Sequence, residues 1–311
     1  MCKTCGCGDE AQAKITNMQT GKQVDLEGET QEHAHTHDHS LDDHTHIHAD
    51  GTTHSHTRED DDDHHRHHHG GAEQGQILSL QRRLLAKNDA IAAQSRVWLQ
   101  GREILALNIM SSPGAGKTTL LERTIAELKD EVPLFVIEGD QATSVDGERM
   151  RVAGASTVQV NTGAGCHLEA DMIARGLMEL RPSTGAIVMI ENVGNLVCPA
   201  LFDLGESCKV VILSVTEGED KPLKYPQMFQ AARLMIINKI DLAPYVEFDR
   251  ERCLVNARRV NQNIEVIELS SKTGEGFLTL RAWLLQELAR TRDETWRLSD
   301  GSRPEGLIEM H

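Results

Sequence analysis

Residues 111–119, SSPGAGKTT, decide the fold of this 311-residue chain. They follow an apolar run, ILALNIM at 104–110, and lead into an amphipathic stretch. A glycine-rich loop that ends in Lys and Thr between a strand and a helix is typical of a phosphate-binding P-loop. Ser111 replaces the usual first glycine, but Gly114 and Gly116 still allow the backbone N–H groups to turn toward phosphates. The stretch therefore predicts a nucleotide-binding domain.

Each residue of this loop has an expected role. Lys117 is expected to contact the β- and γ-phosphate oxygens, and Thr118 to offer its hydroxyl to Mg²⁺. The loop residues predicted to bind the nucleotide are Gly114, Ala115, Gly116, Lys117, Thr118 and Thr119.

The sequence NKID at 238–241 indicates which base is bound. It follows the apolar run RLMII at 233–237 directly, and its aspartate is placed to accept hydrogen bonds from the N1 and N2 groups of guanine. Adenine offers no such donor pair. The stretch SSK at 270–272 resembles the SAK loop that supports the base in GTPases. GTP and GDP are therefore the predicted ligands, and the predicted base-binding residues are Asn238, Lys239, Asp241, Ser271 and Lys272.

Apolar runs alternate with amphipathic stretches from about residue 76 onward. A long helix is expected first, and strands are predicted at 104–110, 132–139, 156–162, 186–192, 209–218, 233–241 and 264–271. Near-continuous apolar strands between helices predict an α/β fold, a mostly parallel sheet with helices on both faces. This P-loop NTPase domain is expected over residues 76–295, with a tail at 296–311.

Two acidic residues follow strands at the predicted phosphate edge. Asp140 comes after VIEG, and Glu191, in ENVGN, stands where many GTPases have DxxG. Carboxyl ends of parallel strands deliver side chains to one edge of the sheet, so both carboxylates are expected near Mg²⁺ and the attacking water. The predicted catalytic residues are Lys117, Asp140 and Glu191.

The first quarter of the chain is acidic and rich in histidine. Residues 1–76 carry 16 acidic and 5 basic side chains, and residues 33–69 contain 14 of the 16 histidines. With almost no apolar side chains in the histidine tract, residues 9–75 are expected to be a disordered leader that buffers metal. Imidazole suits Ni, Zn and Cu, so the tract does not name the metal.

The overall charge and hydropathy exclude some partners. No cluster of Lys and Arg stands out, which argues against nucleic acid. No run of 18 apolar residues and no basic-then-apolar export signal occur in the sequence, so neither a membrane span nor secretion is expected. A cytoplasmic location is predicted, and the thiols are then expected to be reduced.

Residues 1–8, MCKTCGCG, form a separate candidate metal site. Cys2, Cys5 and Cys7 can wrap one ion without a folded scaffold, and the amine of Met1 is close enough to supply a fourth donor. One nitrogen and three sulfurs in a plane would suit Ni(II), because square-planar geometry is typical of Ni(II) and Cu(II). A redox CxxC pair is the alternative.

A second candidate site lies in two loops at the same predicted edge as the phosphate loop. Cys166 and His167 follow the third strand, and Cys198 follows the fourth. A metal held there could respond to the γ-phosphate, which sets the conformation of such loops. Two or three ligands hold a soft ion incompletely, so a site shared by two protomers is expected. Cys208 and Cys253 are interpreted as buried apolar side chains.

These motifs together resemble the hydrogenase nickel-incorporation GTPases of the HypB family, over essentially the whole chain. The resemblance rests on MCKTCGCG, the histidine-rich leader, SSPGAGKTT, GDQAT, GAGCHLEADM, ENVGNLVCPA and NKID. It implies a slow GTPase of the SIMIBI class that dimerises with nucleotide. It also implies nickel at Cys2, Cys5 and Cys7, and nickel or zinc at Cys166, His167 and Cys198.

The resemblance further implies partners. These are a HypA-type nickel and zinc metallochaperone and the large-subunit precursor of [NiFe]-hydrogenase, which would receive nickel under control of GTP hydrolysis.

Three alternatives stay open. A urease-type nickel GTPase shares the nucleotide motifs but carries a Cys-Pro-His site, whereas Cys198 and Pro199 precede Ala200 here. The chain could chiefly store nickel on its leader. A redox-sensing switch would instead form a disulfide in the CxxC stretch.

Overall fold

The computed structural model describes residues 13–26, 44–47, 53–56, 70–140, 145–163 and 165–300. The chain divides into two compact units, each with its own contacts. Residues Gly28–Arg82 form the smaller unit, and Met1–Glu27 together with Arg83–His311 form the larger one. The predicted ligands Cys2, Cys5 and Cys7 lie outside the described residues.

The smaller unit contains a short hairpin and the first part of a long helix. Strands β3 (His44–Ile47) and β4 (Thr53–His56) pair antiparallel. Helix α1 (Gly70–Gln100) starts in this unit and continues into the sequence of the larger one. The helix predicted from residue 76 is therefore present and starts six residues earlier.

The larger unit is built on a nine-stranded sheet in the order β11-β10-β9-β5-β8-β6-β7-β1-β2. The seven strands from β5 to β11 are parallel, as their near-continuous apolar sequences predict. Each overlaps one of the seven predicted runs. The strands are β1 (Lys14–Asn17), β2 (Gln23–Asp25), β5 (Leu105–Ser111), β6 (Leu134–Asp140), β7 (Ser156–Asn161), β8 (Ile187–Glu191), β9 (Cys208–Ser214), β10 (Ala232–Asn238) and β11 (Glu265–Glu268).

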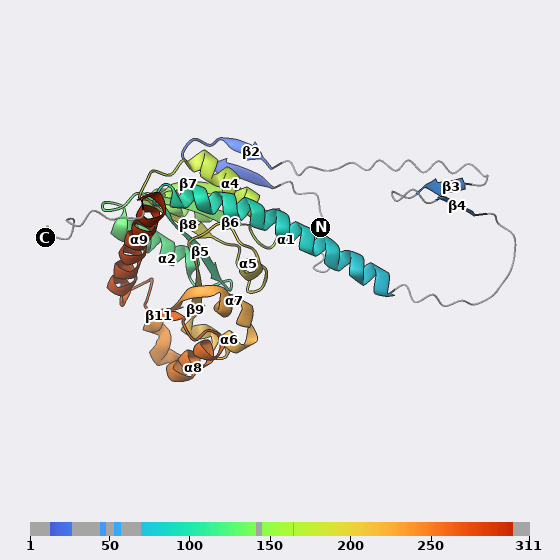
Figure 1. Ribbon diagram of the computed structural model, residues 1–311. Coiled ribbons are helices and arrows are strands. Elements are labelled where there is room, and N and C mark those ends of the chain that lie inside the picture. The colour runs from blue at the N-terminus through green and yellow to red at the C-terminus, as the bar shows by residue number, and fades with distance from the viewer. Residues whose placement is uncertain are drawn as a thin grey trace. The chain divides into compact units, whose positions relative to one another are not determined.

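Helices cover both faces of this sheet (Figure 1). Side chains alternate along β5, so Leu105 and Leu107 pack with α2 and α9 while Ala106 packs with α1 and α4 on the other face. The described helices are α2 (Lys117–Leu128), α3 (Val145–Ala153), α4 (Ala170–Leu180), α5 (Cys198–Leu201), α6 (Lys221–Lys224), α7 (Pro226–Ala231), α8 (Arg250–Val260) and α9 (Phe277–Asp300), with 3-10 turns η1 (Val215–Glu217) and η2 (Ile240–Tyr245). The predicted α/β architecture is confirmed.

Every helix in the described ranges is too short or too polar to cross a membrane. Helix α9 continues five residues past the predicted domain end at residue 295, and residues 301–311 of the predicted tail lie outside the described part.

The predicted range of the disordered leader, 9–75, is wrong for residues 13–26. They form β1 and β2, and β1 pairs antiparallel with β7 at the edge of the main sheet. Ile15 is 1% exposed and joins the core on the α4 side. Four residues are too few to give a periodic signal, and the open hydrogen-bonding edge of β7 determines the pairing. The histidine tract itself lies outside the described residues except for β3 and β4.

Candidate functional site

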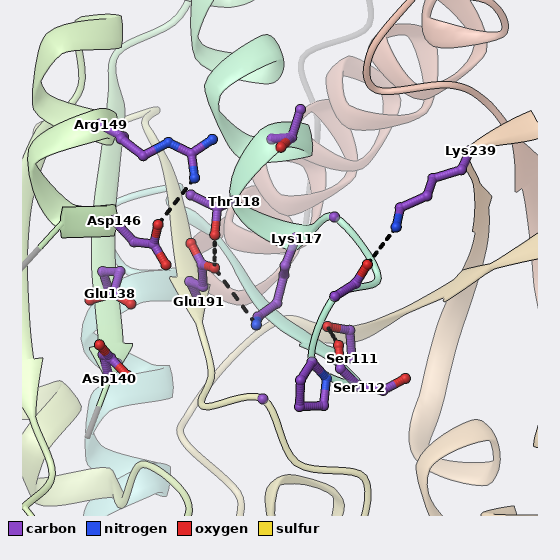
Figure 2. A pocket seen from close by; sticks show the side chains of 16 residues that line it. Ser111, Ser112, Lys117, Thr118, Glu138, Asp140, Asp146, Arg149, Glu191 and Lys239 are labelled. Carbon is purple, nitrogen blue, oxygen red and sulfur yellow. Dashed lines mark hydrogen bonds and ion pairs between the residues drawn. The ribbon is translucent and has the colours of Figure 1, made fainter. Parts of the chain in front are cut away.

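A polar cavity of about 430 Å³ opens where β5, β6 and β8 end. Figure 2 shows its lining side chains, which come from the phosphate loop and the start of α2, from β6, from α3, from the end of β8 and the loop after it, and from Lys239 after β10. The lining residues are Ser111, Ser112, Pro113, Gly114, Gly116, Lys117, Thr118, Thr119, Glu138, Gly139, Asp140, Asp146, Arg149, Glu191, Gly194 and Lys239. The structure thus brings the three predicted catalytic residues to one cavity.

Glycine is required at the turn of the phosphate loop. Gly116 has φ 94°, in the left-handed region, and directly precedes α2. A Cβ atom there would lie 2.6 Å from Nδ2 of Asn238. That amide instead donates to the carbonyl of Ala115 at 2.9 Å, which ties the phosphate loop to the end of β10. The loop therefore has the open backbone that a phosphate cradle needs.

Lys117 and Thr118 both face one carboxylate (Figure 2). The Thr118 hydroxyl donates to Oε1 of Glu191 at 2.9 Å, and the Lys117 ammonium lies 3.7 Å from the same oxygen. Glu191 is 1% exposed, and burial raises its pKa, while the charge of Lys117 opposes that rise. Oε2 of Glu191 has no hydrogen-bond partner.

Two further carboxylates stand beside Glu191. Oxygen atoms of Glu138, Asp146 and Glu191 lie within 4.8 Å of one another. Burial, followed by the charge of Glu191, raises the pKa of Glu138 to about 9, and its Oε2 is buried without a partner. Clustered carboxylate oxygens with two unsatisfied buried atoms are a donor set that fits Mg²⁺. Asp140 lines the same cavity without belonging to this cluster.

Sequence reasoning missed three residues of this cavity. Glu138 is a carboxylate inside an apolar strand, which was a usable signal, because a buried acid without an obvious partner marks a functional site. Asp146 and Arg149 lie on α3 and offered no such signal. The Arg149 guanidinium donates to Asp146 at 3.1 Å and to Glu122 at 2.6 Å, so it joins α3 to α2 beside the cavity.

The predicted base-binding residues form a connected network at the end of β10. The N–H and hydroxyl of Ser271 donate to Oδ1 of Asn238 at 3.0 and 2.9 Å. The Ser270 hydroxyl donates to Asp241 at 2.5 Å. The Lys239 ammonium donates to the carbonyl of Gly114 at 2.6 Å. The NKID and SSK stretches thus support each other and reach the phosphate loop, and the Lys272 side chain is exposed beside them.

The three residues of the second predicted metal site also lie together. Sγ of Cys166 is 3.2 Å from Sγ of Cys198 and 3.6 Å from Nδ1 of His167, and one donor atom of each residue lies within 4.8 Å of the others. The imidazole of His167 stacks on Phe202 at 3.9 Å, and its Nε2 lies 3.6 Å from the Glu169 carboxylate. Hydrogen bonding to His167 lowers the pKa of Glu169.

The other two described cysteines behave differently. Burial raises the pKa of Cys208 and that of Cys253 to about 12. A thiol that stays protonated is a poor ligand, since the thiolate binds metal. Both cysteines pack with apolar residues, in line with their interpretation as buried apolar side chains.

A short path joins the cavity to the cysteine site. Asn192 follows Glu191, and its Oδ1 accepts from the backbone N–H of Leu168, which follows His167, at 3.3 Å. Its Nδ2 donates to Asn108 of β5 at 3.1 Å. A Cβ atom at Gly139 would lie 2.8 Å from the Leu168 side chain. Neighbours of both sites are therefore packed against each other.

Comparisons with known proteins point to one family. Residues 105–268 match the family described as CobW/HypB/UreG, nucleotide-binding domain. The chain is 53% identical over 220 residues to hydrogenase maturation factor HypB of Rhizobium leguminosarum bv. viciae, covering 71% of this chain and 74% of that protein. It is 46% identical over 288 residues to the protein of the same description from Escherichia coli (strain K12), covering 91% and 98%.

The comparison with solved structures points to the same family. The crystal structure of HypB from Helicobacter pylori in complex with nickel matches with TM-score 0.62 and 38% identity, over 66% of this chain and 96% of that one.

Proposed function

The chain belongs to the HypB family of the CobW/HypB/UreG nucleotide-binding domains, and on that premise we propose that it is a GTP-hydrolysing nickel metallochaperone that serves the maturation of [NiFe]-hydrogenase. Its relatives are described as hydrogenase maturation factors, and a similar protein has been crystallised with nickel. The phosphate cavity and the cysteine site described above support the two halves of the proposal.

The chain's own residues would hold the nucleotide at both ends. Gly114 and Gly116 expose backbone N–H groups to the phosphates, and Lys117 supplies the positive charge for the β- and γ-phosphate oxygens. Asp241 would accept from guanine N1 and N2 after releasing the Ser270 hydroxyl. A bound nucleotide would then bridge the two loops that Asn238 already connects.

Thr118, Glu191 and the neighbouring carboxylates would hold Mg²⁺, which supplies charge neutralisation to the transferring phosphoryl group. Asp140 also lines the cavity, at the end of β6, and its proposed role is to orient the attacking water. We expect slow hydrolysis, because the proposed role is that of a switch.

Cys166, His167 and Cys198 would hold nickel as cargo, and zinc is the competing ion. Two thiolates and one imidazole satisfy three positions of a borderline metal. A ligand for the fourth position would come from a second protomer, from the protein that receives the nickel or from the protein that delivers it. The proposed GTP-dependent homodimer would supply the second protomer. The other proposed partners are a HypA-type metallochaperone and the hydrogenase large-subunit precursor.

The observation that carries the gating part of the proposal is the hydrogen bond between Asn192 and Leu168. Glu191 contacts the two residues expected to respond to γ-phosphate and Mg²⁺, and Leu168 directly follows a metal ligand. A shift of Glu191 on nucleotide exchange would therefore displace the backbone beside His167. Reduced thiols are needed throughout, which is in line with the proposed cytoplasmic location.

Equilibrium binding tests the proposal. Nickel would be titrated anaerobically into Cys2/Cys5/Cys7→Ala loaded with GDP or with a non-hydrolysable GTP analogue, with and without Cys166→Ala, and followed by sulfur-to-nickel charge-transfer absorption. The proposal requires a nickel affinity that depends on the nucleotide and a site that disappears with Cys166. Equal affinities with the two nucleotides would exclude gating, and unchanged binding in Cys166→Ala would exclude the site.

A further inference from the structure

Arg149 brings a further positive charge to the phosphate cavity. It lies on α3 and lines the cavity together with Lys117 and Lys239. Lys239 donates to the carbonyl of Gly114, and Lys117 faces Glu191. The side chain of Arg149 is 39% exposed, whereas that of Lys117 is 12% exposed. The Arg149 side chain is therefore less confined than that of the phosphate-loop lysine.

Two carboxylates hold the guanidinium of Arg149 in this structure. Its Nε and Nη2 donate to the two carboxylate oxygens of Glu122 on α2, at 2.9 and 2.6 Å. Its Nη1 donates to Asp146 at 3.1 Å (Figure 2). Two parallel N–H donors facing two oxygens is also the geometry in which arginine binds phosphate. Glu122 therefore occupies the donors that a phosphate group would use.

The position of Glu122 on α2 sets how far Arg149 lies from the expected phosphates. Glu122 follows Thr118 by four residues, so the two side chains lie on the same face of the helix, about 5–6 Å apart. Thr118 is the residue proposed to hold Mg²⁺, and its hydroxyl donates to Glu191. Asp146 has an oxygen within 4.8 Å of Glu191. A move of the guanidinium by about one helical turn, roughly 5 Å, would bring it beside Thr118.

Binding of Mg²⁺ and nucleotide would favour this move. Asp146 belongs to the carboxylate cluster that fits Mg²⁺, and a carboxylate that binds Mg²⁺ is a weaker acceptor for Arg149. The γ-phosphate oxygens would offer the guanidinium new acceptors. Both partners of the pair between Arg149 and Glu122 are partly exposed, and such pairs shift an equilibrium by only about 1.5- to 5-fold. Glu122 can therefore compete with the phosphate without preventing the exchange.

We propose that Arg149 donates to the γ-phosphate oxygens during GTP hydrolysis, and that Glu122 competes with the phosphate for its guanidinium. This inference rests on the proposed function, because it assumes that the cavity hydrolyses GTP. In the reaction, the oxygen of a water molecule forms a bond to the γ-phosphorus, and the bond from that phosphorus to the β–γ bridging oxygen breaks. GDP keeps the electron pair of the broken bond. One proton of the water passes to the solvent, and Arg149 stays protonated throughout.

The experiment substitutes the two partners of the ion pair separately in the full chain. Single-turnover hydrolysis of GTP with Mg²⁺ is measured in wild type, Arg149→Ala, Arg149→Lys, Glu122→Gln and Arg149→Ala/Glu122→Gln. Arg151→Ala is the matched control. Arg151 also lies on α3 and pairs with a carboxylate, Glu148 at 2.6 Å, but it is not among the described residues that line the cavity. Urea unfolding of each variant separates a loss of stability from an effect on the reaction.

The proposal predicts effects of opposite sign from the two partners. Arg149→Ala should lower the rate constant of hydrolysis at least about 10-fold. Arg149→Lys keeps the charge without the paired donors and should lower it less. Glu122→Gln should raise the rate constant about 2- to 5-fold, because it releases the guanidinium. The double variant should match Arg149→Ala, and Arg151→Ala should match wild type.

Nucleotide binding supplies a second readout. GDP with aluminium fluoride imitates the transferring phosphoryl group, so its affinity should fall in Arg149→Ala by about the same factor as the rate constant. The affinity for GDP alone should change less than about 2-fold, since the contact forms with the γ-phosphoryl group. An ion pair that only stabilises the fold would leave the ratio of these two affinities at its wild-type value.

A lower rate constant in both Arg149→Ala and Glu122→Gln would overturn the proposal, because the ion pair would then act only through the fold. An unchanged rate constant in Arg149→Ala would overturn it too, since the guanidinium would not contact the phosphate. A failure of the proposed function is distinguishable. In that case wild type itself would hydrolyse no GTP, or Lys117→Ala would hydrolyse it as fast as wild type.

Discussion

Oδ1 of Asn192 accepts a hydrogen bond from the backbone N–H of Leu168 at 3.3 Å, and both residues are buried. Asn192 is the neighbour of Glu191, which contacts Lys117 and Thr118 in the phosphate cavity. Leu168 is the neighbour of His167, in the cysteine site. One hydrogen bond thus joins the neighbour of Glu191, which we propose senses Mg²⁺ and γ-phosphate, to the neighbour of His167, which we propose holds nickel.

Removal of this hydrogen bond should uncouple the two sites. In Asn192→Ala, we expect the ratio of nickel affinities with GTP analogue and with GDP to fall toward one, while each site still binds its ligand. The measurement is an anaerobic nickel titration in both nucleotide states. Asn256→Ala is the matched control, because Asn256 is equally buried but donates to the carbonyl of Glu219, in the loop after η1. A ratio that stays at the wild-type value in Asn192→Ala would rule out this path.

Substitutions of single cysteines should separate ligands from core residues. In the Cys2/Cys5/Cys7→Ala background, Cys166→Ala should weaken nickel binding by at least about 100-fold, since one of three donors is lost. Cys208→Ala is the control, because burial raises the pKa of Cys208 to about 12 and keeps its sulfur protonated. It should leave nickel binding intact. Charge-transfer absorption reports sulfur ligation and ignores nickel on imidazoles. Equal loss in both variants would assign the effect to misfolding.

Substitution of Asp241 should change which base is bound. Asp241→Asn replaces two charge-assisted acceptor contacts to guanine with an amide that carries its own donors, a loss of about 3 kcal/mol or roughly 100-fold in GTP affinity. Xanthosine triphosphate presents an oxygen where guanine has an amino group, so its binding should improve in the variant. Competition with a fluorescent nucleotide measures both affinities. An unchanged preference for GTP in Asp241→Asn would show that other residues bind the guanine base.

The stability of the nucleotide-free protein should depend on Glu138. Its pKa is about 9 in the folded chain against a reference value of 4.5, so the folded state holds a proton that the unfolded state releases. The stabilisation that this proton provides is full below about pH 4.5 and is lost as pH rises through 9. Between pH 6 and pH 8 this contribution falls by about 3 kcal/mol.

Glu138→Gln keeps the shape of the protonated acid and should remove that part of the slope. Urea unfolding of both proteins in EDTA, at pH 6, 7 and 8, gives the comparison. Parallel pH profiles for wild type and Glu138→Gln would show that Glu138 does not hold its proton in the folded state.

Local sequence patterns were sufficient to predict the parallel sheet. Each of its seven strands is an apolar run of ordinary length, and the phosphate loop between the first strand and its helix has a motif with a defined geometry. The grouping of Cys166 with Cys198 was also predictable, because both follow strands that end at the same edge. The site roles of these residues stay predictions that the experiments above test.

The parts that the sequence did not indicate depend on contacts between distant segments. β1 forms because its backbone pairs with the edge of β7 and because Asn17 donates to the carboxylate of Glu179. Both partners lie far from β1 in the sequence. Asp146 joins the acidic cluster only through the position of α3, which packs against α2, β6 and β7. The hydrogen bond between Asn192 and Leu168 likewise arises from packing between distant segments, which the hydrophobic periodicity of the sequence does not reveal.

The most direct test of the central claim is the nickel affinity of the cysteine site in the two nucleotide states. Cys2/Cys5/Cys7→Ala would be titrated anaerobically with nickel, followed by charge-transfer absorption, with Mg²⁺ and either GDP or a non-hydrolysable GTP analogue. Gating of the metal by the nucleotide predicts affinities that differ at least about 10-fold, a coupling free energy of about 1.4 kcal/mol. Identical affinities in the two states would contradict it, and the GTPase would then not gate the metal.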